Sequence, residues 1–254
     1  MKHLVLFIFL SLFILGCKES EKQQNEFSFV KKIENAHQKK KFATEEVIQF
    51  NLKLSFGGEE KINGKVTLAT NSGKGKITFL DGNTIIFDGG KVYYSPKLDS
   101  TTVRFNAYTW SYFFLFPFKL SDEGTKWESY KNEEKDSNKY LTEKLTFTPK
   151  TGDAPDDWYV VYTDANSNLI QKAAYIVTAY GTKEEAEKNP HAIQYSNYKE
   201  INGIPIATQW KFWGWNKKVG LTEHLGEATL SNIKFIKNDS SLFTPVKNLK
   251  LSNP

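Results

Sequence analysis

The sequence has little cysteine, methionine or histidine, and this limits the chemistry that the chain can carry. It contains one cysteine, one methionine and four histidines. A single thiol cannot form an internal disulfide. The histidines show no H-x-x-x-H spacing typical of zinc ligands, and no nucleophile elbow, phosphate loop or Cys-His pair is present. We therefore expect no metal ion, no cofactor and no catalytic residues.

The chain also lacks a strong charge of one sign. Lysine and arginine number 34 and aspartate and glutamate 29, which gives a formal net charge of +5. Without a dense basic stripe, nucleic acid is not expected as a partner. No segment rich in proline, glycine or serine divides the chain, and no repeat has a fixed period, so residues 26–247 are predicted to form one domain.

The only long apolar run lies at residues 4–15, within a predicted signal peptide at residues 1–16. It has the length of a signal-peptide core and is too short to span a bilayer. The run ends in Ile14-Leu15-Gly16-Cys17, which resembles the lipobox of bacterial lipoproteins, in which cleavage precedes a lipidated cysteine. The alternative is an ordinary secretory signal with an incidental cysteine.

Residues 17–25 follow the predicted cleavage site and are charged or polar, as in a flexible tether. A lipidated Cys17 would anchor the protein to a membrane of the cell envelope. The outer membrane is the expected location, and the sequence does not distinguish its periplasmic face from the cell surface.

Most of the remaining chain alternates apolar and polar residues, which is typical of strands. Residues 26–40 differ, because Phe29, Ile33 and Ala36 recur at helical spacing. Connections of two to four residues, such as Gly57-Gly58, require antiparallel pairing. About eleven strands are expected: 46–56, 60–70, 74–80, 84–88, 91–94, 139–148, 158–163, 169–180, 192–200, 204–215 and 227–236. Residues 183–188 are expected to be a short charged helix or a loop, and residues 248–254 a C-terminal tail.

The most aromatic segment is residues 106–127. Trp110, Phe113, Phe114 and Pro117 fall at i, i+3, i+4 and i+7, which predicts a helix that stops at Pro117. Two interpretations are open for its aromatic side chains: they line a cavity for an apolar ligand, or they fill an ordinary core.

The order of elements resembles the LolA/LolB-like lipoprotein carriers, and in particular a branch of bacterial outer-membrane lipoproteins. The resemblance rests on Phe116-Pro117-Phe118 with Gly124, and on residues 152–164, 195–206 and 239–245. It implies a mainly β fold: a strongly curved antiparallel sheet, or incomplete β-barrel, covered by the N-terminal helix and the central apolar helical insert. It also implies a hydrophobic cavity between sheet and helices.

From the resemblance we expect a membrane-anchored protein that binds a lipid, an acyl chain or another hydrophobic molecule without chemical change. Because Cys17 would tether the chain, a membrane-bound acceptor or sensor is a better analogy than a soluble shuttle. An envelope protein is a further possible partner. The expected ligand-binding residues are Trp110, Phe113, Phe114, Phe116, Phe118, Trp158, Trp210 and Phe212.

Two other functions compete with ligand binding. In residues 209–215, Trp210 and Phe212 are expected on one face of a strand and Trp213 and Trp215 on the other, with a bulge at Gly214. The exposed face could serve as a protein interface of an assembly subunit.

The second alternative to ligand binding is a catalytic or calcium-binding role for a group of carboxylates. Asp153, Asp156 and Asp157 lie close together in the sequence and could serve a hydrolase or bind calcium. They also suit a turn beside Pro155.

Overall fold

The structure is a computed structural model that describes residues 28–135 and 137–252. The predicted signal peptide, Cys17, the predicted tether and the first two residues of the expected N-terminal helix lie outside the described residues.

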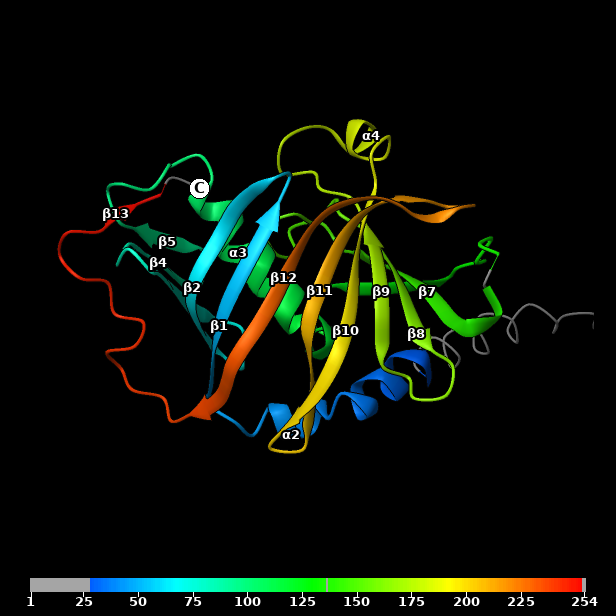
Figure 1. Cartoon of the computed structure of the whole chain (residues 1–254), viewed down its shortest axis with the longest axis horizontal. Coiled ribbons are helices and arrows are strands. Elements are labelled where there is room, and N and C mark those ends of the chain that lie inside the picture. The colour runs from blue at the N-terminus through cyan, green and yellow to red at the C-terminus, as the bar shows by residue number, and fades with distance from the viewer. Residues whose placement is uncertain (1–27, 136, 253–254) are drawn as a thin grey trace, which may run out of the picture.

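One antiparallel sheet dominates the molecule (Figure 1), and the described part of the chain contributes thirteen strands to it. Their order is β13-β5-β4-β3-β2-β1-β12-β11-β10-β9-β8-β7-β6. The strands are β1 (Val47–Phe56), β2 (Glu59–Ala69), β3 (Lys74–Phe79), β4 (Thr84–Asp88), β5 (Lys91–Tyr94), β6 (Thr125–Ser129), β7 (Tyr140–Phe147), β8 (Tyr159–Asp164), β9 (Ile170–Tyr175), β10 (His191–Ile201), β11 (Ile204–Asn216), β12 (Gly220–Ile236) and β13 (Lys250–Leu251).

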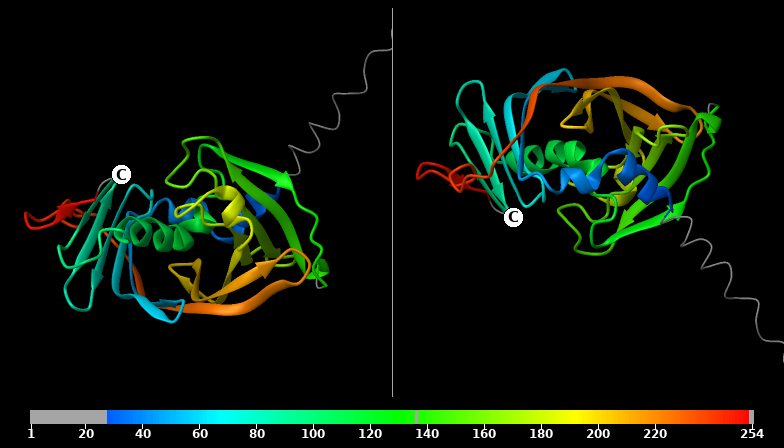
Figure 2. Two further views of the ribbon diagram at one scale, coloured as in Figure 1. Left: turned by 90° about the horizontal axis from the view of Figure 1, so that it is seen from above. Right: turned by 90° about the horizontal axis from the view of Figure 1, so that it is seen from below.

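The sheet curves strongly without closing (Figure 2). Among the described residues, β6 pairs with β7 alone and β13 with β5 alone, so both remain edges. The predicted fold class, an incomplete antiparallel barrel covered by helices, is confirmed.

The central helix α3 (Val103–Leu115) lies inside the curve of the sheet (Figures 1 and 2). It continues as a short 3-10 helix, η1 (Phe116–Phe118). The α-helix ends before Pro117, as predicted, because proline provides no N–H for a helical hydrogen bond. Trp110, Phe113 and Phe114 of α3 are buried because the sheet surrounds the helix on several sides.

The N-terminal helical segment lies across the lower ends of the central strands (Figure 1). It consists of two pieces, residues 28–36 and α2 (Lys39–Phe42), instead of the single helix expected over residues 26–40. The break occurs at Gln38, which has φ 57° and ψ 40°. Its side-chain amide donates to the carbonyl of Asn35 at 3.1 Å. The turn directs Phe42 into the core.

Some expected boundaries were wrong. β6 and β13 were not predicted because each is short, and β6 contains one apolar residue, Trp127. β9 ends at Tyr175, not at residue 180, and β12 begins at Gly220, not at residue 227. The charged segment after β9 forms α4 (Lys183–Ala186), and a 3-10 helix, η2 (Ser137–Lys139), precedes β7.

Apolar side chains pack on both faces of the sheet. The main core joins the inner face to α3, η1 and the N-terminal helical segment. A smaller cluster containing Trp158, Tyr162 and Trp215 occupies the other face. No helix in the described residues is long and apolar enough to cross a membrane.

Candidate functional site

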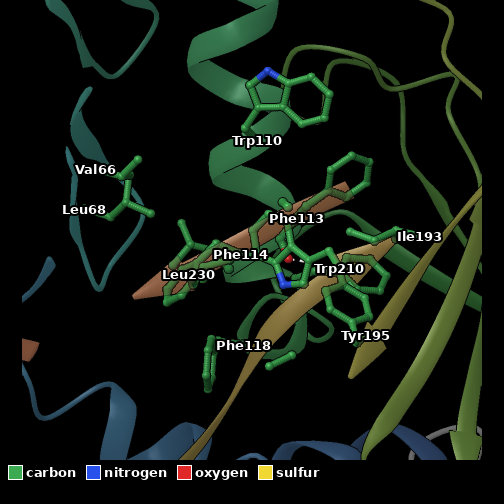
Figure 3. Packing of buried hydrophobic residues seen from close by; sticks show 14 of the residues in the cluster. Val66, Leu68, Trp110, Phe113, Phe114, Phe118, Ile193, Tyr195, Trp210 and Leu230 are labelled. Atoms are coloured by element: carbon green, nitrogen blue, oxygen red, sulfur yellow. Dashed lines mark hydrogen bonds between the residues drawn. The ribbon is translucent and has the colours of Figure 1, made fainter. Parts of the chain in front are cut away.

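The last turn of α3 is packed tightly against the sheet (Figure 3). The rings of Phe114 and Phe50 stack with centroids 4.4 Å apart. Tyr195 on β10 donates its hydroxyl to the carbonyl of Phe113 at 2.9 Å. In this region the aromatic rings form a core, which is the second of the two interpretations.

The η1 helix, which follows the carboxyl-terminal end of α3, is also tightly packed. Phe118 stacks on Phe42 of α2, with ring centroids 3.7 Å apart and planes 4° apart. Phe116 is fully buried against Tyr159, at 5.0 Å between centroids. The remaining space is a cavity of about 10 Å³ lined by Phe114, Phe118, Trp210 and their neighbours. We call this region the closed end; it has room for about one water molecule.

His37 lines the same small cavity and is fully buried. Its Nε2 accepts the N–H of Ile170 at 3.1 Å. Burial lowers the pKa of His37 to about 3, and the carbonyl of Pro205 opposes this only in part. The imidazole is therefore neutral at physiological pH and contributes to the closed end as a structural group.

The amino-terminal end of α3 differs, because it opens into a cleft of about 710 Å³, which we call the open end. Three connections surround the cleft: the β1–β2 turn, the loop before α3 and the segment around α4. Its lining includes the buried side chains of Trp110, Phe113 and Tyr175 and the partly exposed side chains of Phe56 and Phe105.

Aromatic contacts hold this cleft in shape. Phe105 lies with its ring centroid 5.8 Å from that of Trp110 and 5.2 Å from that of Tyr180. Trp110 also donates its indole N–H to the side chain of Asn106 at 2.9 Å. His191 stacks on Tyr175 at 5.8 Å between centroids, and its buried Nδ1 has no hydrogen-bond partner among the described residues.

The predicted ligand-binding residues are placed in four different environments. Trp110 and Phe113 line the cleft. Phe114, Phe118 and Trp210 line the small cavity of the closed end, while Phe116 and Phe212 are packed in the main core. Trp158 lies apart from all of these, on the other face of the sheet, where its ring meets that of Trp215 at 6.1 Å between centroids.

Several residues of the cleft were not identified from the sequence. They are Phe56, Phe105, Tyr175, Tyr180 and His191, which come from separate elements. Phe105 immediately precedes the aromatic segment, so that segment could have been extended toward its amino-terminal side. No local pattern distinguishes the others, since their proximity depends on how the sheet curves.

The aspartates proposed for a hydrolase have structural contacts. Asp153 forms an ion pair with Arg104 of α3. Asp157 accepts the backbone N–H and the hydroxyl of Thr178, both at 2.8 Å. Burial raises the pKa of Asp157 to about 6. Neither these two nor Asp156 lines the cleft. In the described residues no group of three or more His, Cys, Asp or Glu side chains is placed to hold a metal ion.

The tryptophans of β11 divide between the faces as their spacing predicts. Trp210 belongs to the main core, whereas Trp215 belongs to the cluster on the other face. The register with β12 shifts on both sides of Trp213, as in a bulge. Trp213 donates to Gln194 at 3.2 Å and packs edge-on against His224.

No family model matches the sequence, and no curated protein matches it in sequence. Solved structures do resemble the fold. A LolA superfamily protein from Nitrosomonas europaea is 12% identical with a TM-score of 0.56, over 87% of this chain and 97% of that one. A domain from Vibrio parahaemolyticus, described as an outer membrane lipoprotein-sorting protein, is 13% identical with a TM-score of 0.51, over 85% and 97% of the two chains. At these identities the likeness shows the fold alone, and that fold is LolA-like.

Proposed function

We propose that this protein is a lipoprotein of the bacterial cell envelope that binds a hydrophobic ligand in the cleft at the open end. The ligand is a lipid, an acyl chain or another apolar molecule, and it is bound without chemical change. Trp110 and Phe113 form the floor of the site, and Phe56, Phe105 and Tyr175 form its sides.

The cleft is the observation that carries this proposal. Its volume of about 710 Å³ lies within the range usual for small-molecule sites. It is formed between the sheet and α3, and its buried lining side chains, Trp110, Phe113 and Tyr175, are aromatic. The lipoprotein-sorting description of the Vibrio domain agrees with an acyl chain as ligand.

The energetics favour a ligand with a flexible apolar chain. Each buried methylene contributes about 0.8 kcal/mol, so a segment of about ten methylenes contributes about 8 kcal/mol before the costs of association are subtracted. The aromatic part of the cleft supplies affinity that depends little on the shape of the ligand's polar group.

The N-terminus supplies the proposed membrane anchor. In this proposal residues 1–16 are removed, Cys17 is lipidated, and residues 17–25 connect the lipid to the domain at the outer membrane. A Cys17→Ser variant should leave the membrane fraction for the soluble fraction of a cell lysate. If it stays with the membrane as firmly as the unaltered chain, lipid anchoring through Cys17 is wrong.

The ligand site is tested by filling the cleft. Thr109 is a partly exposed residue of α3 that lines the cleft, whereas Thr229 is an exposed residue of β12 outside it. Thr109→Trp should weaken uptake of the uncharged dye N-phenyl-1-naphthylamine by about tenfold or more, because the indole occupies the ligand's volume. Thr229→Trp is the matched control and should bind the dye normally. Equal binding by the two variants would exclude the cleft as the site.

A further inference from the structure

The mouth of the cleft carries an excess of negative charge. Its charged lining residues are Glu59 and Glu60 beside the β1–β2 turn, Lys61 next to them, Asp99 before α3 and Glu185 on α4. Lys61 forms an ion pair with Glu59. Within the described residues no ion pair involves Glu60, Asp99 or Glu185. These three, which we call the acidic rim, therefore have uncompensated charges.

The acidic rim is held in place by hydrogen bonds that leave its charge intact. Asp99 accepts the N–H of Thr101 at 3.0 Å, and Glu185 accepts the N–H of Thr182 at 2.9 Å within a capping box. Glu60 accepts from the side-chain amide of Asn63 at 3.1 Å. The three carboxylates come from different elements, and all three line the cleft.

Lys61 is the positively charged side chain among the described residues that line the cleft, and its ion pair is with Glu59 and not with the acidic rim. His191 is the titratable base at the inner wall, and burial lowers its pKa, although Glu223 acts in the opposite direction. The chain as a whole has a formal charge of +5. The negative potential at the mouth is thus a local property of the cleft, opposite in sign to the protein's net charge.

We propose that the cleft selects a single-chain amphiphile with a cationic head group: the apolar chain enters between Phe56, Phe105 and Trp110, and an ammonium or guanidinium head remains at the acidic rim. This inference rests on the proposed function, because it specifies the ligand of the same site. The apolar floor binds the chain of such a molecule, and the negatively charged mouth attracts its positive head group. The same negative charges repel the head group of an anionic amphiphile.

The test compares three amphiphiles with the same twelve-carbon chain. Calorimetric titration of the purified full chain carrying Cys17→Ser would use dodecyltrimethylammonium, dodecyl maltoside and dodecyl sulfate below their micelle concentrations. The cationic amphiphile should bind about tenfold more tightly than the neutral one at low ionic strength, and most of this preference should disappear at about 0.15 M salt, where the Debye length is about 8 Å.

Two triple variants distinguish the effect of the acidic rim from the effect of the protein's net charge. Glu60→Gln with Asp99→Asn and Glu185→Gln should abolish the preference while keeping affinity for dodecyl maltoside. The matched control alters three exposed carboxylates outside the cleft by the same total charge: Glu123→Gln, Glu200→Gln and Glu227→Gln. It should keep the preference. Thermal unfolding of both variants would show that they are folded.

The outcomes are distinct. A preference lost in the rim variant and kept in the control supports the inference. Equal binding of the three amphiphiles, or tighter binding of dodecyl sulfate, overturns it and leaves the proposed function standing. If none of the three binds, both the inference and the proposed function are wrong. If the rim variant does not fold, the salt dependence of amphiphile binding by the protein with an unaltered rim tests the same claim.

Discussion

The two ends of α3 contain similar numbers of aromatic rings but leave very different amounts of space. At the closed end the cavity is about 10 Å³, and at the open end the cleft is about 710 Å³. The difference comes from what covers each end. The N-terminal helical segment places His37 and Phe42 against the closed end, whereas turns and the short α4 surround the open end. Aromatic content alone therefore does not identify a binding site; the covering elements do.

The largest effect is expected from opening the closed end. Phe118→Ala should lower the free energy of unfolding by about 3–5 kcal/mol, because it removes a buried ring and leaves a cavity against Phe42. Urea denaturation would measure this. Dye uptake in the native cleft should be unchanged, and a loss of less than about 1 kcal/mol would contradict tight packing there.

The closed end should also make stability depend on pH through His37. Its folded-state pKa is about 3, against an ordinary value of 6.5. Below pH 6.5 the unfolded chain binds a proton that the folded chain does not, so this group's contribution to the free energy of unfolding falls by about 1.4 kcal/mol per pH unit down to about pH 3.

Asp157 acts with the opposite sign, since its pKa is raised to about 6. It binds a proton in the folded state first, which adds stability as the pH falls below 6. The free energy of unfolding should therefore be measured against pH for the unaltered protein and for His37→Gln. Asp157 contributes equally to both, so the difference between the two profiles reports on His37 alone. Parallel profiles from pH 7 to 4 would show that the imidazole is protonated in the folded protein.

At the open end, a truncation should affect binding more than folding. Phe105 is partly exposed and lines the cleft. Phe105→Ala should cost about 1 kcal/mol of stability, less than a fully buried ring, while lowering dye affinity severalfold. Parallel fluorescence titration and urea denaturation would measure both quantities. A stability loss as large as that of Phe118→Ala would mean that the two ends are packed alike.

The smallest effect is expected for the ion pair between Arg104 and Asp153. It joins α3 to the loop after β7, and its side chains are 25% and 39% exposed. Asp153→Asn should reduce stability by no more than about 1 kcal/mol, because partly exposed pairs are screened by solvent. Thermal unfolding at low and high salt would measure the change. A salt-independent loss well above this size would show that the pair is essential to the open end.

Much of the fold could be predicted from local sequence patterns. Period-two alternation and short Gly-containing turns indicated an antiparallel sheet, and Pro117 marked the end of the central helix. The order of helices and strands along the chain indicated the half-barrel. β6 and β13 were missed because two to five residues carry too little periodicity.

The candidate site was harder to predict because space depends on tertiary contacts. The spacing of Trp110, Phe113 and Phe114 showed which residues share a helix face, but not whether a ring or a ligand lies opposite. Phe50 meets Phe114, while Trp110 faces the cleft. The burial of His37 likewise depends on β9 and on Pro205, more than a hundred residues away in the sequence.

Native mass spectrometry of the protein purified from its cells would show whether the cleft carries a ligand. We expect one apolar molecule bound to each chain, released by organic extraction, present in Thr229→Trp and absent in Thr109→Trp. A mass without any adduct in the unaltered protein, together with no uptake of N-phenyl-1-naphthylamine, would contradict this expectation and would mean that the cleft is not a ligand site.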